Sequence, residues 1–478
     1  MNGLFFHDTP PSRWGREPGA RRPATREAAA ADGRGWLFEL WDAEGDAIRT
    51  EARALGLRLE FGGHHLSALV PRERFAEQPE WFPLRRGRRD GRFNLCTSSA
   101  GARAELRANA ARFFARFAGA DVYHLWADDL RGGGWCECGG CVRLSPSDQA
   151  LRAANAAAEV LGGMAPGARL AHLAYHDTLA RPGKVRPLEN VDALWAPRAR
   201  CYAHAIDDPG CQRNREHLQE LERLIAWFGG PERVRVFEYY SDSILFKWMA
   251  PPHLEVVPAD LRAYGRLGVR GVQDLAVTPR PWWGPTWHAW WFARCAREGG
   301  GNPETALSAF CGAAFGDAAE AFAAAFRELE TACRLLLERG ELEPRRGYDV
   351  LDYGDTPREG LRALAGRARD ALNHFGAAAR ALPLGVGGEA LAQTEEFAPT
   401  VAAGMHLAER VLAWDAALHG DREGSASHLA LARLHLRALT DWYHAHASPA
   451  FGNLGEGMLD AARRRMDEIA ALAGLTAG

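Results

Sequence analysis

Two adjacent carboxylates follow a short apolar run, and a third ends another such run later in the chain. Residues 122–126 lead into Asp128 and Asp129, and Glu238 closes the second run. Hydrolysis of a glycosidic bond needs two carboxyl groups, one to protonate the leaving oxygen and one to attack the anomeric carbon or activate water. We predict Asp129 as general acid, Asp128 as its orienting partner and Glu238 as nucleophile or base. The alternative is that these acids cap helices or pair with arginines.

Three cysteines within six residues form a second candidate site, Cys136, Cys138 and Cys141. Thiolates this close suit zinc, which takes four nitrogen or sulfur ligands in a tetrahedron. We predict a structural zinc site here, with three reduced thiols or a catalytic thiol as the alternatives. The fourth ligand could come from a later loop that carries Cys201, His204 and Cys211.

Aromatic and polar side chains recur near the predicted strand ends, and the chain holds 16 tryptophans. An aromatic ring suits the apolar C–H face of a sugar, so together these residues predict a sugar pocket. Taken singly, each is as well explained as a core or loop residue. The predicted substrate-binding residues are His64, His65, Trp126, Tyr175, His176, Trp195, Arg200, Tyr202, His204, Tyr239, Tyr240, Asp274, Trp282 and Trp283.

Short strand patterns alternate with helical patterns along the first 300 residues. This alternation predicts an α/β fold, a (β/α)8 TIM-type barrel, whose chemistry lies at the carboxyl ends of the strands. The acids would then end strands four and seven, where many retaining barrel glycosidases carry their catalytic pair. The predicted strands cover residues 35–41, 57–61, 93–96, 122–126, 169–175, 191–195, 234–237 and 269–277.

The composition changes along the chain and predicts three parts. Residues 1–34 are rich in Pro, Arg and Ala without a steady period and predict an irregular arm. Residues 35–301 form the predicted barrel. Residues 302–478 are dominated by Ala, Leu, Arg and Glu at helical spacing, which predicts an all-helical domain. That domain could cover the barrel mouth or form a homo-oligomer interface.

The net charge and the number of cysteines indicate which partners and which cellular compartment to expect. The formal net charge is −3, which argues against nucleic acid or an anionic membrane as a partner. The N-terminus lacks a secretory pattern, and no run of eighteen or more apolar residues predicts a membrane span. An odd count of nine cysteines favours a reducing, cytoplasmic setting.

Several motifs together resemble a known family. They are GGHHLSALVPRERF, a W-x-D-D followed by WCECGGC and SPSDQ, APRARCYAH-x(6)-C and VFEYYSD. Over roughly residues 35–300 the chain resembles the bacterial domain of unknown function 4838. The resemblance implies a glycosidase-like barrel, distantly similar to α-glucuronidases of glycoside hydrolase family 67 and hexosaminidases of family 20. Family 20 enzymes carry an Asp-Glu pair on strand four, whereas this chain has Asp128-Asp129 and lacks an evident export signal.

These observations lead to one main functional prediction. We expect a glycoside hydrolase that acts on a small oligosaccharide or glycoconjugate and needs no cofactor for its chemistry. A non-catalytic carbohydrate-binding protein on the same barrel is the first alternative. A zinc enzyme that uses the cysteine group and a bound water is the second.

Overall fold

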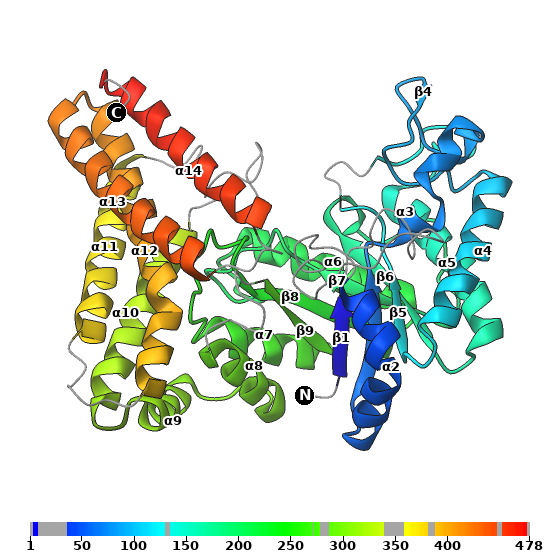
Figure 1. Ribbon diagram of the computed structural model, residues 1–478, viewed down its shortest axis with the longest axis horizontal. Helices are drawn as coiled ribbons and strands as arrows, with labels where there is room; N and C mark the ends of the chain where they lie inside the picture. The colour runs from blue at the N-terminus through cyan, green and yellow to red at the C-terminus, as the bar shows by residue number, and fades with distance from the viewer. Residues whose placement is uncertain are drawn as a thin grey trace. The chain divides into compact units, whose positions relative to one another are not determined.

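A computed structural model gives the structure of this chain and describes residues 3–7, 36–129, 134–269, 271–277, 286–338, 358–380, 388–446 and 452–475. One parallel sheet has the strand order β1-β2-β5-β6-β7-β8-β9 (Figure 1). Its strands are β1 (Gly3–His7), β2 (Arg58–Gly63), β5 (Val122–Leu125), β6 (Arg169–Tyr175), β7 (Val191–Ala196), β8 (Val234–Asp242) and β9 (Val272–Val277). A small hairpin pairs β3 (Leu84–Arg85) with β4 (Arg88–Arg89).

Helices connect these strands, and helices with short turns make up the described residues after Asn302. Ser99 and Ser145 cap α4 and α5 with their hydroxyl oxygens. The helices are α2 (Trp36–Ala54), α3 (Leu66–Leu69), α4 (Ala100–Arg116), α5 (Pro146–Met164), α6 (Gln212–Phe228), α7 (Val256–Arg266), α8 (Thr286–Glu298), α9 (Pro303–Phe315), α10 (Ala319–Glu338), α11 (Arg358–Arg380), α12 (Gly388–Leu418), α13 (Arg422–His446) and α14 (Gly452–Leu472).

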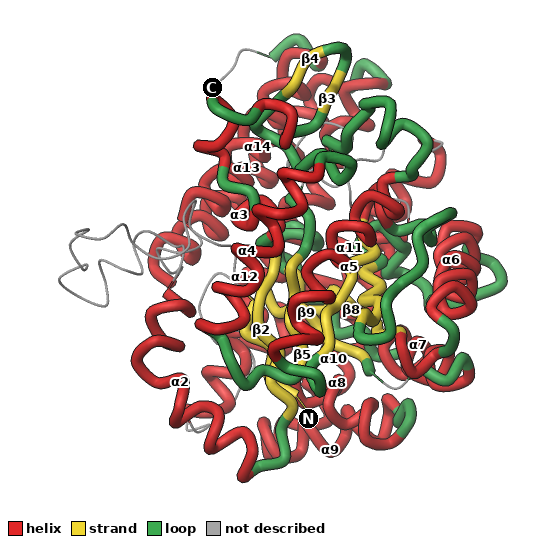
Figure 2. The backbone as a smooth tube through the Cα atoms, turned by 90° about the vertical axis from the view of Figure 1, so that its right-hand side faces the viewer, coloured by secondary structure: helices red, strands yellow, loops and turns green. Residues whose placement is uncertain are grey.

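Successive side chains along the central strands point alternately toward the helices and toward the interior of the curved sheet. The strands β2 and β5 run side by side (Figure 2), in register from Glu60 with Val122. Phe61 stacks on Phe117 at 4.0 Å between ring centroids, on the helix side. The neighbouring side chain of Glu60 points to the opposite side, where His124 contacts it.

Contacts across the interior side show that the sheet curls. Glu60 of β2 forms an ion pair with Arg235 of β8, and Gln273 of β9 donates to Glu60 at 2.8 Å. In a flat sheet, four strand spacings of about 4.8 Å would separate β2 from β8 by roughly 19 Å. The sheet therefore curves like part of a barrel, although the strand order ends at β1 and β9 and a closed eight-stranded barrel is not confirmed.

Two of the predicted strands differ from the structure. Residues 36–41 begin helix α2, whose Trp41 packs on Phe61, and the first strand is β1, inside the arm predicted to be irregular. Residues 93–96 form a loop, in which Cys96 donates its backbone N–H to the carbonyl oxygen of Trp81. Burial explains this second error, because Leu95 and Cys96 are as buried as strand residues.

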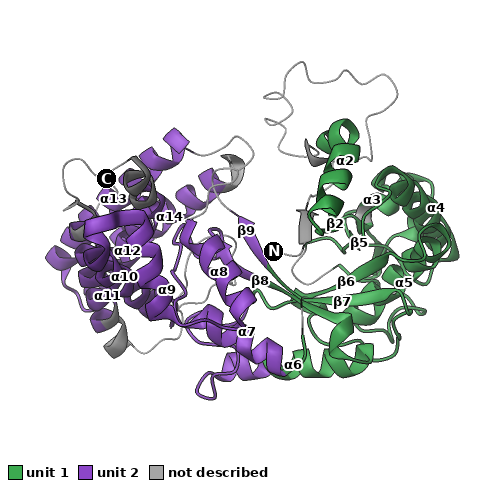
Figure 3. Ribbon diagram, turned by 90° about the horizontal axis from the view of Figure 1, so that it is seen from below, with its two compact units in different colours: residues 1–198, 217–237, 267–273 green, residues 199–216, 238–266, 274–478 purple. Residues whose placement is uncertain are grey.

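The chain divides into two compact units (Figure 3). Unit 1 comprises Met1–Arg198, His217–Phe237 and Leu267–Gln273; unit 2 comprises Ala199–Glu216, Glu238–Arg266 and Asp274–Gly478. This boundary passes through β8 and β9. In unit 2, α10 packs on α11, α11 on α12, and α12 on α13. The domain limits predicted at residues 34 and 301 stay predictions.

One segment of unit 2, Pro303–Glu338, has the length and mean hydropathy, 1.2, of a membrane span. It consists of two helices, α9 and α10, separated by the 3-10 turn Gly316–Ala318. Phe322, Phe326 and Leu329 of α10 are buried on one face, which is the spacing of a helix in a protein core.

Candidate functional site

A pocket in unit 1 lies where β2, β5 and β6 end. It encloses about 460 Å³, part of which is open to solvent. The carboxyl ends of parallel strands are the usual place for ligands in such sheets. The polar and aromatic residues that line it are His64, Trp126, Asp128, Trp135, His172, Tyr175, His176, Asp177 and Thr178.

Asp128 lies in this pocket and has two fixed partners. Its Oδ2 forms an ion pair with Arg72, which also donates to the carbonyl oxygen of Phe93. The backbone N–H of Asp128 donates to Oδ1 of Asn94 at 2.9 Å. The guanidinium therefore supplies a counter-charge for the carboxylate, and the loop of Asn94 fixes the backbone beneath it.

Asp129 points away from these partners. Its side chain is 58% exposed, and its Oδ1 lies 3.7 Å from Nε2 of His176. Adjacent residues at a strand end face opposite directions, which explains why the two carboxylates have different surroundings. Asp129 is thus positioned to accept a hydrogen bond from a polar ligand beside His176.

Asp177 provides another acid in the same pocket. Burial raises its pKa above the ordinary 3.8, and a hydrogen bond from the indole N–H of Trp135, at 2.7 Å, opposes that rise. The preceding residue, His176, has φ of 49°, a left-handed conformation that non-glycine residues seldom adopt. Backbone strain of this kind is concentrated at functional sites.

Aromatic rings form much of the pocket wall. The ring of His64 meets the edge of Trp126 at 5.2 Å, and its Nδ1 bonds to the carbonyl oxygen of Ala127. The rings of Tyr175 and His176 lie 3.7 Å apart. Flat rings beside carboxylates suit a ligand with both apolar C–H faces and hydroxyl groups, as sugars have.

A buried polar cluster continues from the pocket into the interior of unit 1. Glu60 accepts from His124 at 2.9 Å and pairs with Arg235, and the ring of His124 meets Trp126 at 5.2 Å. Burial alone would raise the pKa of Glu60, but the hydrogen bond with His124 and the charge of Arg235 lower it to about 2. Glu60 therefore remains ionised beneath the pocket at neutral pH.

Glu238 belongs to unit 2 and has a different environment. Its side chain is 0% exposed, and Arg200 lies 3.2 Å from its Oε1. Tyr202 donates to it at 2.9 Å and Tyr264 donates to it from α7. Arg200 also pairs with Asp260, so the guanidinium joins two buried carboxylates. These are the surroundings of a structural ion pair, and the catalytic role predicted for Glu238 stays a prediction.

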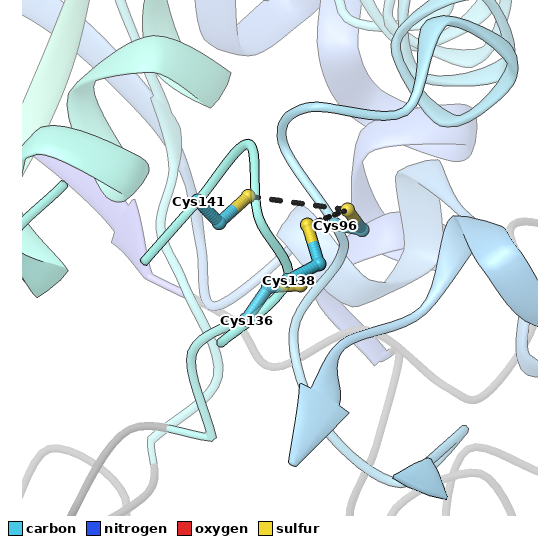
Figure 4. Close-up of side chains that lie close together, drawn as sticks. All are labelled: Cys96, Cys136, Cys138 and Cys141. Atoms are coloured by element: carbon cyan, nitrogen blue, oxygen red, sulfur yellow. Dashed lines mark hydrogen bonds between the residues drawn. The ribbon is translucent and has the colours of Figure 1, made fainter. Parts of the chain in front are cut away.

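Four thiols of unit 1 come together: Cys96, Cys136, Cys138 and Cys141. Their sulfur atoms all lie within 4.8 Å of one another. Figure 4 shows the sulfurs of Cys138 and Cys141 directed toward that of Cys96. The fourth thiol of this group is Cys96, whereas the sequence suggested that a fourth ligand could come from the later loop. Residues of that loop form a separate group in unit 2, consisting of Cys201, His204 and Cys211.

Comparison with known proteins identifies the family. The model of the family described as "Domain of unknown function (DUF4838)" matches residues 42–327. The chain belongs to DUF4838. No protein with a curated description matches this DUF4838 chain.

Three solved structures align with the DUF4838 chain at 11% sequence identity. A GH138 enzyme targeting pectin rhamnogalacturonan II aligns over 99% of this chain and 84% of its own, with a TM-score of 0.47. An O-GlcNAc hydrolase of Thermobaculum terrenum aligns over 98% and 93%, with a TM-score of 0.40. CpGH89 of Clostridium perfringens, solved with its substrate GlcNAc-alpha-1,4-galactose, aligns over 89% and 47%, with a TM-score of 0.41. Because the sequence identities and TM-scores are this low, the function has to be inferred from the site itself.

The structure gathers some predicted site residues of the DUF4838 chain and buries others. His64, Trp126, Asp128, Tyr175 and His176 line the pocket. His65, Trp195 and Tyr239 lie in the core. Arg200, Tyr202 and Tyr240 belong to the buried network of Glu238 and Asp260 in unit 2. His204 lies 3.3 Å from Cys201, and Asp274 accepts from Ser241 at 2.7 Å. Trp282 and Trp283 lie outside the described residues.

Sequence reasoning missed Asp177, Trp135, Arg72 and Asn94. Asp177 follows the strand predicted at residues 169–175, so the rule that selected the acids after residues 122–126 could have selected it too. Nothing in the sequence pairs Arg72 or Asn94 with Asp128, because those contacts join loops 56 and 34 residues apart.

Proposed function

We propose that the chain is a glycoside hydrolase whose active site is the pocket of unit 1. The observation that carries this proposal is that Asp128 and Asp177 line one pocket in opposite environments. Asp128 forms an ion pair with Arg72. Burial raises the pKa of Asp177 and favours its protonated form. Acid catalysis of glycoside cleavage requires two carboxyl groups in different environments of this kind.

The roles follow from these environments. Asp177 donates its proton to the leaving oxygen as the bond to the anomeric carbon breaks. Asp128 either attacks that carbon or removes a proton from the water that does, so that one water is consumed for each bond cleaved. Asp129, beside His176, accepts a hydrogen bond from a sugar hydroxyl. The ring of Tyr175 provides an apolar face for the sugar.

This assignment changes two roles predicted from the sequence. Asp177 replaces Asp129 as general acid, because burial raises the pKa of Asp177, whereas the side chain of Asp129 is 58% exposed. Asp128 takes the role of nucleophile or base that was predicted for Glu238. The Glu238→Gln variant tests the earlier assignment, since a catalytic carboxylate cannot be replaced by an amide without loss of turnover.

The substrate class follows from the pocket. We propose a short oligosaccharide or glycoconjugate end as the substrate, because the pocket places the rings of His64 and Tyr175 beside the carboxyl group of Asp128. A reducing, cytoplasmic setting is part of the same proposal, because many of the nine free thiols are buried and would be stable there.

The test is hydrolysis of a panel of aryl glycosides and reduced oligosaccharides by the full chain. Asp128→Asn should abolish most turnover of any substrate that the unaltered protein cleaves, and Asp177→Asn should do so for oligosaccharides, whose leaving groups need a proton. Asp46→Asn, on an exposed site of α2, is the matched control. Full activity of either pocket variant would overturn the assignment.

A second candidate is a carbohydrate-binding protein without turnover. The ion pair between Arg72 and Asp128 favours it, because a carboxylate neutralised by a guanidinium is a weaker nucleophile. Calorimetry separates the two: saturable binding of a sugar that is never cleaved would support this candidate, and product formation would exclude it.

A further inference from the structure

The four thiols of unit 1 have the spacing of a tetrahedral metal site. The sulfur of Cys96 lies 3.6 Å from that of Cys138 and 3.9 Å from that of Cys141. A zinc–sulfur distance of about 2.3 Å in a tetrahedron places neighbouring sulfurs about 3.8 Å apart. We propose that Cys96, Cys136, Cys138 and Cys141 bind one zinc ion as a closed structural centre, and that this centre holds the loop segment that positions Asp128.

Hydrogen-bond donors surround the sulfurs, and such donors stabilise negatively charged thiolates. The backbone N–H of Leu84 points at Cys136 at 3.3 Å, and Arg89 lies 3.7 Å from the same sulfur. The hydroxyl of Ser98 lies 3.0 Å from the sulfur of Cys141. Four thiolates and one zinc ion carry a net charge of about −2, and these N–H and O–H groups, with the guanidinium, offset part of it.

The backbone holds the thiols in place through a tight loop. The N–H groups of Cys141 and Val142 both donate to the carbonyl oxygen of Cys138, each at 2.8 Å. Gly140 lets this loop lie against Ser98, since a Cβ there would come within 2.7 Å of the serine hydroxyl. The two loops that provide ligands are therefore already in contact around the proposed ion.

The geometry also argues against a disulfide within this group. A disulfide requires sulfurs about 2.05 Å apart, and all four cysteines are free. Cys136 and Cys141 are buried, as is Cys96. Four protein thiolates fill a tetrahedral site and leave no position for water, so the centre is structural and a zinc-bound water does not act in catalysis.

The proposed centre adjoins the active site through short links. Asn94, which accepts from the backbone of Asp128, lies two residues before Cys96. Trp135, which donates to Asp177, directly precedes Cys136. Binding of zinc to Cys96 and Cys136 would fix both segments beside the pocket. This positioning role rests on the proposed function, whereas the binding of zinc does not.

The test begins with metal content. The full chain, purified under reducing conditions with zinc supplied during expression, is analysed by mass spectrometry of its metals. We expect the Cys96→Ala variant to contain about one zinc fewer per chain than the unaltered protein. Cys311→Ala is the matched control, because Cys311 is an equally buried free cysteine outside both thiol groups. A difference between variants also separates this centre from any metal held by Cys201, His204 and Cys211.

A second measurement does not depend on how well a variant folds. Cobalt(II) exchanged into the unaltered chain should give the intense visible and sulfur-to-metal charge-transfer bands of a tetrahedral four-thiolate site. Hydrogen exchange should then show faster exchange at residues 93–98 and 134–141 after zinc removal, with α10 unchanged.

Two results would overturn the proposal: an unaltered chain with no bound zinc, or zinc retained in full by Cys96→Ala. Zinc binding without any glycoside cleavage would count against the proposed function alone. Cleavage that is equal in loaded and zinc-free protein would count against the positioning role alone.

Discussion

The indole N–H of Trp135 donates a hydrogen bond of 2.7 Å to Oδ2 of Asp177. This contact joins the loop that follows β5 to the turn that follows β6, at the pocket where both acids lie. It occupies Oδ2 of Asp177 and opposes the rise of the pKa that burial causes. The contact therefore affects both the orientation and the pKa of Asp177. A proton donor to a glycosidic oxygen needs a suitable orientation and a suitable pKa.

Replacement of Asp177 by Asn should lower kcat/KM by about 10²–10⁴-fold, because the amide cannot donate a proton to the leaving oxygen. The loss should be much smaller for aryl glycosides with acidic leaving groups, which depart without protonation. Thermal unfolding should stay close to that of the unaltered protein, since Asn retains the shape and the bond to Trp135. Equal losses for good and poor leaving groups would contradict the acid role.

The pH profile should follow the same acid. Asp177 must be protonated to act, so activity should fall as the pH rises through its raised pKa. Because the bond from Trp135 lowers that pKa, the Trp135→Phe variant should move the alkaline limb of kcat/KM to higher pH. The Phe114→Leu variant, altered behind the sheet, should leave the limb in place. A limb that moves to lower pH in Trp135→Phe would show that another group sets it.

How much of this site could be read from the sequence depends on the distance along the chain between contacting residues. Strand-end acids such as Asp128 were visible because an apolar run and a carboxylate are neighbours in sequence. The fourth thiol, Cys96, was not, because it lies 40 residues before Cys136. The loop of residues 93–96 was taken for a strand because burial against other loops gives the same apolar pattern as burial in a sheet.

The fold could be predicted from the sequence to a similar degree. The predictions for strands β5, β6 and β7 agree almost to the residue, since β5 and β7 are buried along their whole length and β6 along most of its length. Strand β1 was missed because five residues, GLFFH, have no periodicity of their own and depend on pairing with β2. The curl of the sheet rests on contacts such as Glu60 with Arg235, which no local pattern reveals.

Glu238 should matter for stability whether or not it acts in catalysis. Glu238→Gln removes a fully buried charge beside Arg200, and breaking a buried ion pair typically costs about 3–5 kcal/mol. Asp260 still pairs with Arg200, so we expect a value near the lower end of that range. Urea unfolding measures it, with the exposed Glu255→Gln as control. Activity measured well below the unfolding temperature separates the roles: loss of turnover in a folded variant would restore the catalytic assignment.

Glu60 predicts how the protein responds to acid. Its pKa falls from 4.5 to about 2 on folding, so it stabilises the fold above about pH 5, and this contribution is lost as the pH falls toward 2. The shift corresponds to on the order of 3 kcal/mol at neutral pH. Glu60→Gln should therefore lower the free energy of unfolding by about that amount at pH 7 and by roughly half or less at pH 3. The exposed Glu77→Gln should change it little at either pH. A Glu60→Gln deficit that is the same at both pH values would mean that the glutamate acts through packing and hydrogen bonds, not through its charge.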